Sequence, residues 1–220
     1  MVWLQKAADP FIDPLLFRNK PFRNGVFVGM TLFSVVLGVF FLIPLMLTQV
    51  HALSTQQIGL LLFPGAISAV FMGPYAGALA DKRGNAFVAA IGVVLLAGSM
   101  VAMAALLGFT PWVILVAMLA NYVGFTMFQT AMINSVSQTL APEQSGIGMG
   151  IFNLISIVAG ALGTTMVGRI LDNQWFDSGW LSMSGNTTGF AYSDILAVMT
   201  LIAAASGWVF HVTFNTRKPA

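Results

Sequence analysis

The chain has 220 residues, of which 58% are hydrophobic and only 7% are charged, with a mean hydropathy of +0.88. Because a soluble domain carries about 25% charged residues, this composition excludes a soluble enzyme and indicates an integral membrane protein. The sequence has no cysteine, which excludes disulfides and thiolate metal sites. A net charge of +2 is too small to suggest a nucleic-acid partner.

Residues 1–24 are predicted to form a cytoplasmic amphipathic leader. The first twenty residues carry charges throughout and are interrupted by Pro10 and Pro14. They lack the continuous apolar centre and small-residue cleavage site of a signal peptide, so no cleavable signal is expected.

Six apolar stretches follow, each long enough to cross a bilayer. A spanning helix needs about 20 apolar residues, because a rise of about 1.5 Å per residue must cover about 30 Å of hydrocarbon. The pattern predicts an all-α membrane domain of six transmembrane helices within residues 25–214. The expected helices cover residues 25–47, 57–80, 86–109, 111–138, 146–170 and 192–214. An outer loop is expected at about 172–190 and a cytoplasmic tail at 215–220.

The basic residues predict the orientation. If the helices alternate in direction, one basic residue, Arg169, falls on one side of the membrane and all the others fall on the opposite side. Those others are Lys6, Arg18, Lys20, Arg23, Lys82, Arg83, Arg217 and Lys218. Since Lys and Arg accumulate in cytoplasmic segments, both termini are expected in the cytoplasm.

Small residues and prolines interrupt the apolar helices. Pairs of small residues four apart predict close contacts between helix backbones, which is how helices associate in lipid. The pairs are Gly73 and Gly77, Gly146 and Gly150, and Ala159 and Gly163. Pro44 and the Pro64-Gly65 pair are expected to bend their helices.

The turn GALADKRG at residues 77–84 concentrates charge between two apolar stretches. Lys82 and Arg83 fit a simple cytoplasmic anchor under the positive-inside rule. Asp81 and Gly84 are less well explained that way. An acid at a helix end suits pairing with a base or with a helix N-terminus of a neighbouring element, and such a pair could form and break during a conformational change.

This turn resembles the cytoplasmic signature of the major facilitator superfamily, in which Gly77, Asp81, Arg83 and Gly84 match. The basic pair that usually follows the final glycine is replaced here by Asn85 and Ala86. Four longer stretches resemble the carboxyl-terminal half of fourteen-helix drug/proton antiporters, and in particular of TetL-type tetracycline efflux proteins. These stretches are residues 9–25, 50–84, 146–171 and 191–210.

The resemblance implies half of a transporter, because members of the family have twelve or fourteen helices. It implies a half-size exporter of tetracycline-like or other amphipathic drugs that works by alternating access, as a homodimer in the inner (plasma) membrane. A fragment, a decayed gene or a partner-dependent half without transport activity remain as alternatives. The implied energy source is a proton gradient, and the drug could travel as a divalent-metal complex. No cofactor, resident metal or enzyme activity is expected, since no metal-ligand cluster, nucleophile elbow or phosphate loop is present.

The family signature also implies a conformational latch on the cytoplasmic side. By its match to this sequence, the latch comprises Gly77, Asp81, Lys82, Arg83 and Gly84. In this role Asp81 would hold one conformation closed and would not carry protons.

Candidate residues for the substrate cavity come from aromatic, methionine and amide side chains within the expected helices. Asn121, Phe125 and Gln129 lie within about 80° on one helix face, and amides in lipid tend to face protein or water. Aromatic and methionine side chains more often pack or face lipid. The candidates are Met30, Phe33, Asn121, Phe125, Gln129, Asn153 and Ser156, with Phe40 and Phe41 as further aromatics of the first helix.

The proton-coupling group is hard to place, because none of the seven acids lies in the middle of an expected helix. By the resemblance, Gly160 occupies the position at which TetL-type proteins carry an intramembrane acid. The remaining titratable candidates are Asp81, Asp194 and His51, all near the expected membrane interfaces.

Overall fold

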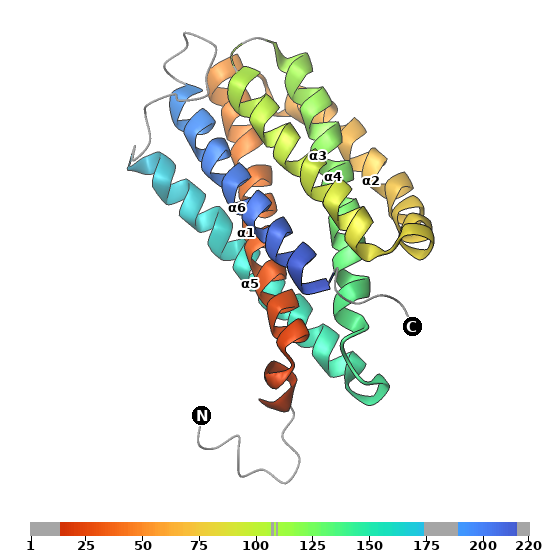
Figure 1. Ribbon diagram of the computed structural model, residues 1–220. Helices are drawn as coiled ribbons and strands as arrows, with labels where there is room; N and C mark the ends of the chain where they lie inside the picture. The colour runs from red at the N-terminus through yellow and green to blue at the C-terminus, as the bar shows by residue number, and fades with distance from the viewer. Residues whose placement is uncertain (1–13, 107, 109, 174–188, 215–220) are drawn as a thin grey trace.

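The computed structural model describes residues 14–106, 108, 110–173 and 189–214, and within them the chain is all-α (Figure 1). Six of the described helices are long and apolar enough to cross a membrane, which confirms the predicted fold class. They are α1 (Lys20–His51), α2 (Thr55–Arg83), α3 (Asn85–Leu106), α4 (Pro111–Ser137), α5 (Ser145–Asp172) and α6 (Phe190–Phe214), with short 3-10 helices η1 (Pro14–Arg18) and η2 (Pro142–Gln144).

The six helices form a bundle whose neighbours differ from the chain order. Along one row, α2 packs on α4, α4 contacts α1, and α1 packs on α5. Across this row, α3 packs on α4 and α6 packs on α1, while α3 and α6 also contact each other. Figure 1 shows α2 and α5 at opposite sides of the bundle, and α1 begins at the same end at which α6 finishes.

The helix bounds extend beyond the apolar stretches in several places. The first helix begins at Lys20 and ends at His51, whereas the apolar stretch covers residues 25–47. The apolar stretch gives only the part of the helix that must lie in hydrocarbon. The helix itself continues into polar surroundings until a residue leaves the helical conformation. Here the turn comes at Ala52, which has a left-handed conformation with φ 52°. Of the leader predicted at 1–24, residues 14–18 form η1 and residues 20–24 already belong to α1. Residues 1–13 of the leader, residues 174–188 of the predicted outer loop and the predicted tail at 215–220 lie outside the described residues.

Two tight connections join α1, α2 and α3. Ser54 caps α2, since its hydroxyl accepts from the Gln57 N–H and the Gln57 side chain accepts from the Ser54 N–H in return. At the other end Gly84 alone separates α2 from α3, with φ 86°, a value that favours glycine. The helices themselves run unbroken through Pro44, Pro64 and Pro74.

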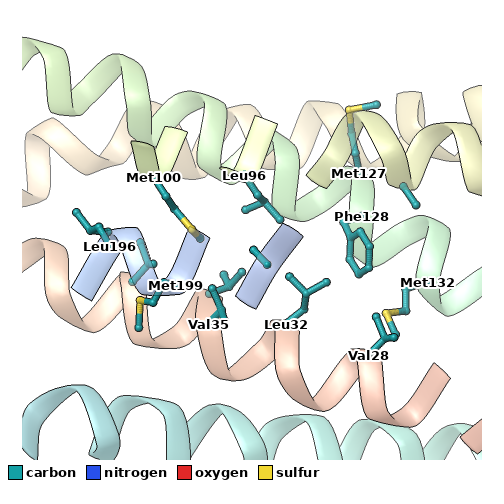
Figure 2. Close-up of a cluster of buried hydrophobic side chains, with 14 of the residues drawn as sticks. Val28, Leu32, Val35, Leu96, Met100, Met127, Phe128, Met132, Leu196 and Met199 are labelled. Carbon is teal, nitrogen blue, oxygen red and sulfur yellow. The ribbon is translucent and has the colours of Figure 1, made fainter. Parts of the chain in front are cut away.

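The hydrophobic core lies between α1, α3, α4 and α6. Figure 2 shows Leu32 and Val35 of α1 pointing toward Leu96 and Phe128 of α3 and α4, with Leu196 of α6 beside them. In the same view α5 lies on the other side of α1. α1 is therefore the most enclosed span, with 56% of its apolar window buried, while α2 is the least enclosed at 11%.

Glycines allow α1 to approach three neighbours. A Cβ atom added at Gly25 would meet Val136 of α4, one at Gly29 would meet Phe152 of α5, and one at Gly38 would meet Met199 of α6. A larger side chain of each neighbour thus occupies the space over a glycine of α1. Between helices in lipid, such steric fit replaces the hydrophobic effect as the source of association.

The predicted small-residue pairs have different surroundings. Gly163 lies against the Ser34 backbone and the Ala159 carbonyl accepts from the Ser34 hydroxyl at 2.6 Å, which confirms a close α5–α1 contact. By contrast, a Cβ at Gly77, Gly146 or Gly150 would meet no atom within 4 Å. These three positions face open space within the described part of the chain.

A close backbone approach also joins α3 to α4, and it generates a stability prediction. An added Cβ at Gly92 would lie 2.7 Å from the Phe128 nitrogen and 2.8 Å from the Gly124 oxygen. Gly92→Ala should therefore lower the thermal midpoint in detergent, by a loss of about 1–3 kcal/mol, because backbone atoms cannot move aside as side chains do. Gly98→Ala is the matched control on the same helix, since no atom lies within 4 Å of its added Cβ. Equal thermal midpoints for the two variants would contradict a close backbone contact between α3 and α4 at Gly92.

Candidate functional site

Four aromatic side chains form a continuous set where α1 meets α4, which we call the aromatic ladder. Phe33 contacts Phe125 edge-to-face at 5.7 Å between ring centroids. Phe125 contacts Phe40 at 6.1 Å, and Phe40 stacks on Tyr122 at 4.8 Å with an interplanar angle of 26°. All four side chains are half-buried, so each keeps part of its surface accessible.

The ladder follows from helical spacing. Phe33 and Phe40 are seven residues apart on α1, which places them two turns apart on one face. Tyr122 and Phe125 are three residues apart on α4, which makes them neighbours on that helix. Gly65 of α2 leaves room for Tyr122, because an added Cβ there would come within 2.6 Å of the tyrosine ring.

Polar groups of α4 continue along the same side of the helix. Gln129 lies one turn beyond Phe125 and is half-buried. The Thr126 and Thr130 hydroxyls donate to the carbonyls of Tyr122 and Thr126, each at 2.9 Å, so these two hydroxyl donors are engaged within the helix. Flat aromatic surface beside an amide is suited to a molecule that is mostly apolar and carries a few polar atoms.

The structure brings three of the seven predicted cavity residues together and places the others elsewhere. Phe33, Phe125 and Gln129 lie at or beside the ladder. Met30 lines a separate pocket of about 250 Å³ between α1, α5 and α6. Asn153 is exposed on α5, away from the α1–α4 contact. Whether any of these residues binds substrate stays a prediction.

Asn121 and Ser156 are fully buried within helix contacts. The Ser156 hydroxyl donates to the Phe152 carbonyl at 2.8 Å, next to Gly29 of α1. Asn121 donates from Nδ2 to the Ser99 hydroxyl of α3 at 2.9 Å, and its Oδ1 has no partner. A buried unpaired acceptor costs about 1–3 kcal/mol, and the bilayer core offers no water to satisfy it.

Tyr122 and Ser99 were not predicted from the sequence. Tyr122 could have been found from its spacing to Phe125, since residues three apart share a helix face. Nothing in the local sequence marks Ser99, because its contact with Asn121 depends on how α3 and α4 pack.

The predicted latch lies at the α2–α3 turn, where Asp81, Lys82, Arg83 and Gly84 are all exposed. The Arg83 guanidinium lies 5.1 Å from the centre of the Phe87 ring, a distance suited to a cation–π contact. Asp81 forms no ion pair with any residue in the described part of the chain. A partner for this carboxylate would therefore have to come from outside the described helices.

The proton-coupling candidates lie at the two ends of the bundle. Asp81 is exposed, His51 is half-buried at the end of α1, and Asp194 is buried near the start of α6. Around Asp194, the Tyr192 hydroxyl donates to Gln49 at 2.7 Å and the Ser193 hydroxyl donates to the Ala104 carbonyl at 2.9 Å. These bonds join the ends of α1, α3 and α6.

Gly160 lies against α1. It occupies the position at which TetL-type proteins carry an acidic residue. The space that a side chain at this position would need is occupied by Leu37. An acidic side chain at position 160 would have to displace Leu37, so the packing of α1 on α5 is consistent with glycine there.

The profile of the Major Facilitator Superfamily matches residues 4–164. A multidrug resistance protein B homolog of Mycobacterium tuberculosis (strain CDC 1551 / Oshkosh) is 28% identical over 77% of this chain and 32% of its own length. Riboflavin transporter RibZ of Clostridioides difficile is 29% identical over 72% of this chain and 35% of its own length. Methyl viologen resistance protein SmvA of Salmonella typhimurium is 30% identical over 68% of this chain and 33% of its own length. The matched part of the chain thus spans about a third of each of these relatives.

Proposed function

Since the chain belongs to the major facilitator superfamily, we propose that it forms half of a membrane exporter for amphipathic, drug-sized molecules. The observation that carries the proposal is the aromatic ladder, with its accessible ring surface beside Gln129. Two relatives are named for resistance and a third for riboflavin transport. Riboflavin and methyl viologen are both flat aromatic molecules, a shape that stacks well on such rings. Tetracyclines are the first drugs to test, because the sequence resembles TetL-type tetracycline efflux proteins.

Transport by alternating access needs a second wall opposite the ladder. In this fold family substrate sites lie between two six-helix halves that are related by an axis along the membrane normal. A second copy of the chain can supply that half, because α1 begins and α6 ends at the same side of the bundle and a parallel copy keeps this topology. The exposed apolar side chains of α2, among them Val70 at 72% and Phe71 at 76%, are available to such a partner.

A partner-dependent half, or a fragment of a longer transporter, is the second candidate function. It is favoured by the fact that the matched region covers about a third of the relatives' lengths. In this case the same ladder forms one wall of the cavity and a different chain or segment supplies the other.

The ladder predicts a direct effect on export. In cells that express the chain, Phe40→Ala should reduce uncoupler-sensitive efflux of tetracycline by about tenfold or more, because it removes the ring that joins Tyr122 to Phe125. Trp208→Ala on α6 is the matched control, since this side chain is 73% exposed and lies outside the ladder. Equal efflux for Phe40→Ala and the parent, at equal membrane levels, would exclude the ladder as the binding surface.

Another prediction concerns the latch. Asp81→Asn should abolish drug resistance without affecting membrane insertion, because the amide keeps the shape of the side chain but loses the charge that pairs with the second half. Glu143→Gln is the control, since it neutralises another exposed carboxylate, in η2 between α4 and α5. Unchanged resistance in Asp81→Asn would remove this residue from the transport cycle.

The oligomeric state distinguishes a homodimer from a partner-dependent half. Two copies of the chain with different tags, expressed together and extracted in native lipid particles, should purify as a pair with twice the chain's mass. A monomer in lipid, together with no efflux from cells that contain only this chain, would favour the partner-dependent half. Recovery of an unlike chain in the same particles would identify that partner.

A further inference from the structure

An apolar groove of about 560 Å³ runs between α3 and α4, away from the aromatic ladder. It lies toward the end of the bundle where α3 finishes and α4 begins. Its rim includes Val94 of α3 and Trp112 of α4, which are 70% and 72% exposed. Since α3 and α4 are membrane-spanning helices, these exposed apolar side chains face the bilayer, and the groove opens to lipid.

The groove exists because the side chains along this stretch are small. α3 and α4 are in backbone contact at Gly92 and Gly124, which fixes how closely the two helices approach. Toward their connection, Gly98 and Ala102 of α3 face Ala117 of α4, and these residues leave the space between the larger rim side chains unfilled. A Cβ added at Gly98 would meet no atom within 4 Å.

Besides the indole N–H of Trp112, the wall of this groove carries the hydroxyl of Ser99, which is bonded to an amide that has an unsatisfied oxygen. The Ser99 hydroxyl donates to the Leu96 carbonyl at 2.8 Å and accepts from Nδ2 of Asn121 at 2.9 Å. Asn121 is completely buried, and its Oδ1 has no hydrogen-bond partner. Oδ1 and Nδ2 are bonded to the same carbon, so this free acceptor belongs to the side chain that donates to the groove hydroxyl.

We propose that the α3–α4 groove binds a flat apolar molecule that carries one hydrogen-bond donor and enters from the bilayer. The rings occupy the space over Gly98 and Ala102, against Trp112. The donor reaches the Ser99 hydroxyl on the groove wall, and when the side chains of Ser99 and Asn121 turn together, the buried Oδ1 behind it gains the partner that it lacks. The site is separate from the aromatic ladder and does not depend on the proposed export function.

The polar pair favours this occupant over two others. An acyl chain of a phospholipid would fill the apolar volume but has no donor along its length, so the Asn121 acceptor would stay unpaired. A helix from a second copy of the chain would cover the groove, but its backbone donors are already engaged in its own hydrogen bonds, so a side-chain donor would have to fall at one exact position to reach the acceptor. A hydroxyl or N–H group on a small ring system satisfies both the volume and the acceptor.

The test uses two probes that differ in the donor. The protein is reconstituted in phosphatidylcholine vesicles without any ion gradient, and 1-naphthol or 1-methoxynaphthalene is added at matched concentrations in the lipid. The fluorescence difference between the parent and Trp112→Phe isolates the signal of the groove tryptophan. We expect saturable quenching by 1-naphthol and about tenfold weaker binding of 1-methoxynaphthalene, because the ether keeps the rings but cannot donate.

Two variants test the groove itself. Gly98→Leu should abolish saturable quenching by 1-naphthol, because its side chain fills open space that the rings would occupy. Gly59→Leu is the control, since Gly59 of α2 also has no atom within 4 Å of its added Cβ and does not line the groove. Asn121→Leu should make the two probes bind equally, since it removes the acceptor but keeps a side chain of similar size.

The comparison of the two probes on the parent protein tests the groove even if Asn121→Leu fails to fold. Equal affinity of the two probes would overturn it in favour of a groove for acyl chains. Quenching that does not saturate, or that Gly98→Leu leaves unchanged, would overturn it as well. A Trp112 signal that disappears as the protein-to-lipid ratio rises would show that a second copy covers the groove, and this result would also overturn the proposal.

Discussion

The enclosed position of α1 is the constraint on which the rest of the bundle depends. This helix contacts α4, α5 and α6, and its glycines at 25, 29 and 38 each receive a larger side chain from one of those neighbours. In lipid the apolar surface of a helix gains little by leaving its surroundings, so close steric fit must hold helices together. The identity of three α1 residues therefore decides how near three other helices can lie.

This packing also determines what each polar side chain can do. Where α1 meets α5, the helices approach so closely that Ser156 is enclosed and the Leu37 side chain covers position 160. Where α1 meets α4, larger aromatic residues keep the helices apart and leave ring surface accessible. The same central helix thus has one face that is closed by small residues and another that is lined by rings, and only the second resembles a binding surface.

The outer helices α2 and α5 leave part of their surface uncovered. α2 has only 11% of its apolar window buried, and Gly77, Gly146 and Gly150 face open space on α2 and α5. These two helices lie at opposite sides of the bundle (Figure 1). The proposed second group of helices would cover this surface, and the matched part of the chain spans about a third of each of these relatives.

The sequence by itself determined the class of protein and the number of spans, because the cost of placing polar groups in hydrocarbon acts on every residue and leaves long apolar runs. The signature at 77–84 also pointed to the family that the comparison identifies. The exact ends of the helices could not be predicted from the sequence, since α1 continues to His51 beyond its apolar stretch.

Only the tertiary structure decided which candidate residues meet. Asn121, Phe125 and Gln129 share part of a helix face by spacing, yet Asn121 is turned into the contact with α3 while Phe125 joins the ladder. Helical periodicity gives the angle of a side chain about its own axis, and it carries no information on which neighbour lies at that angle. That neighbour is fixed by steric contacts between residues far apart in the chain, such as Gly92 with Gly124 and Gly65 with Tyr122.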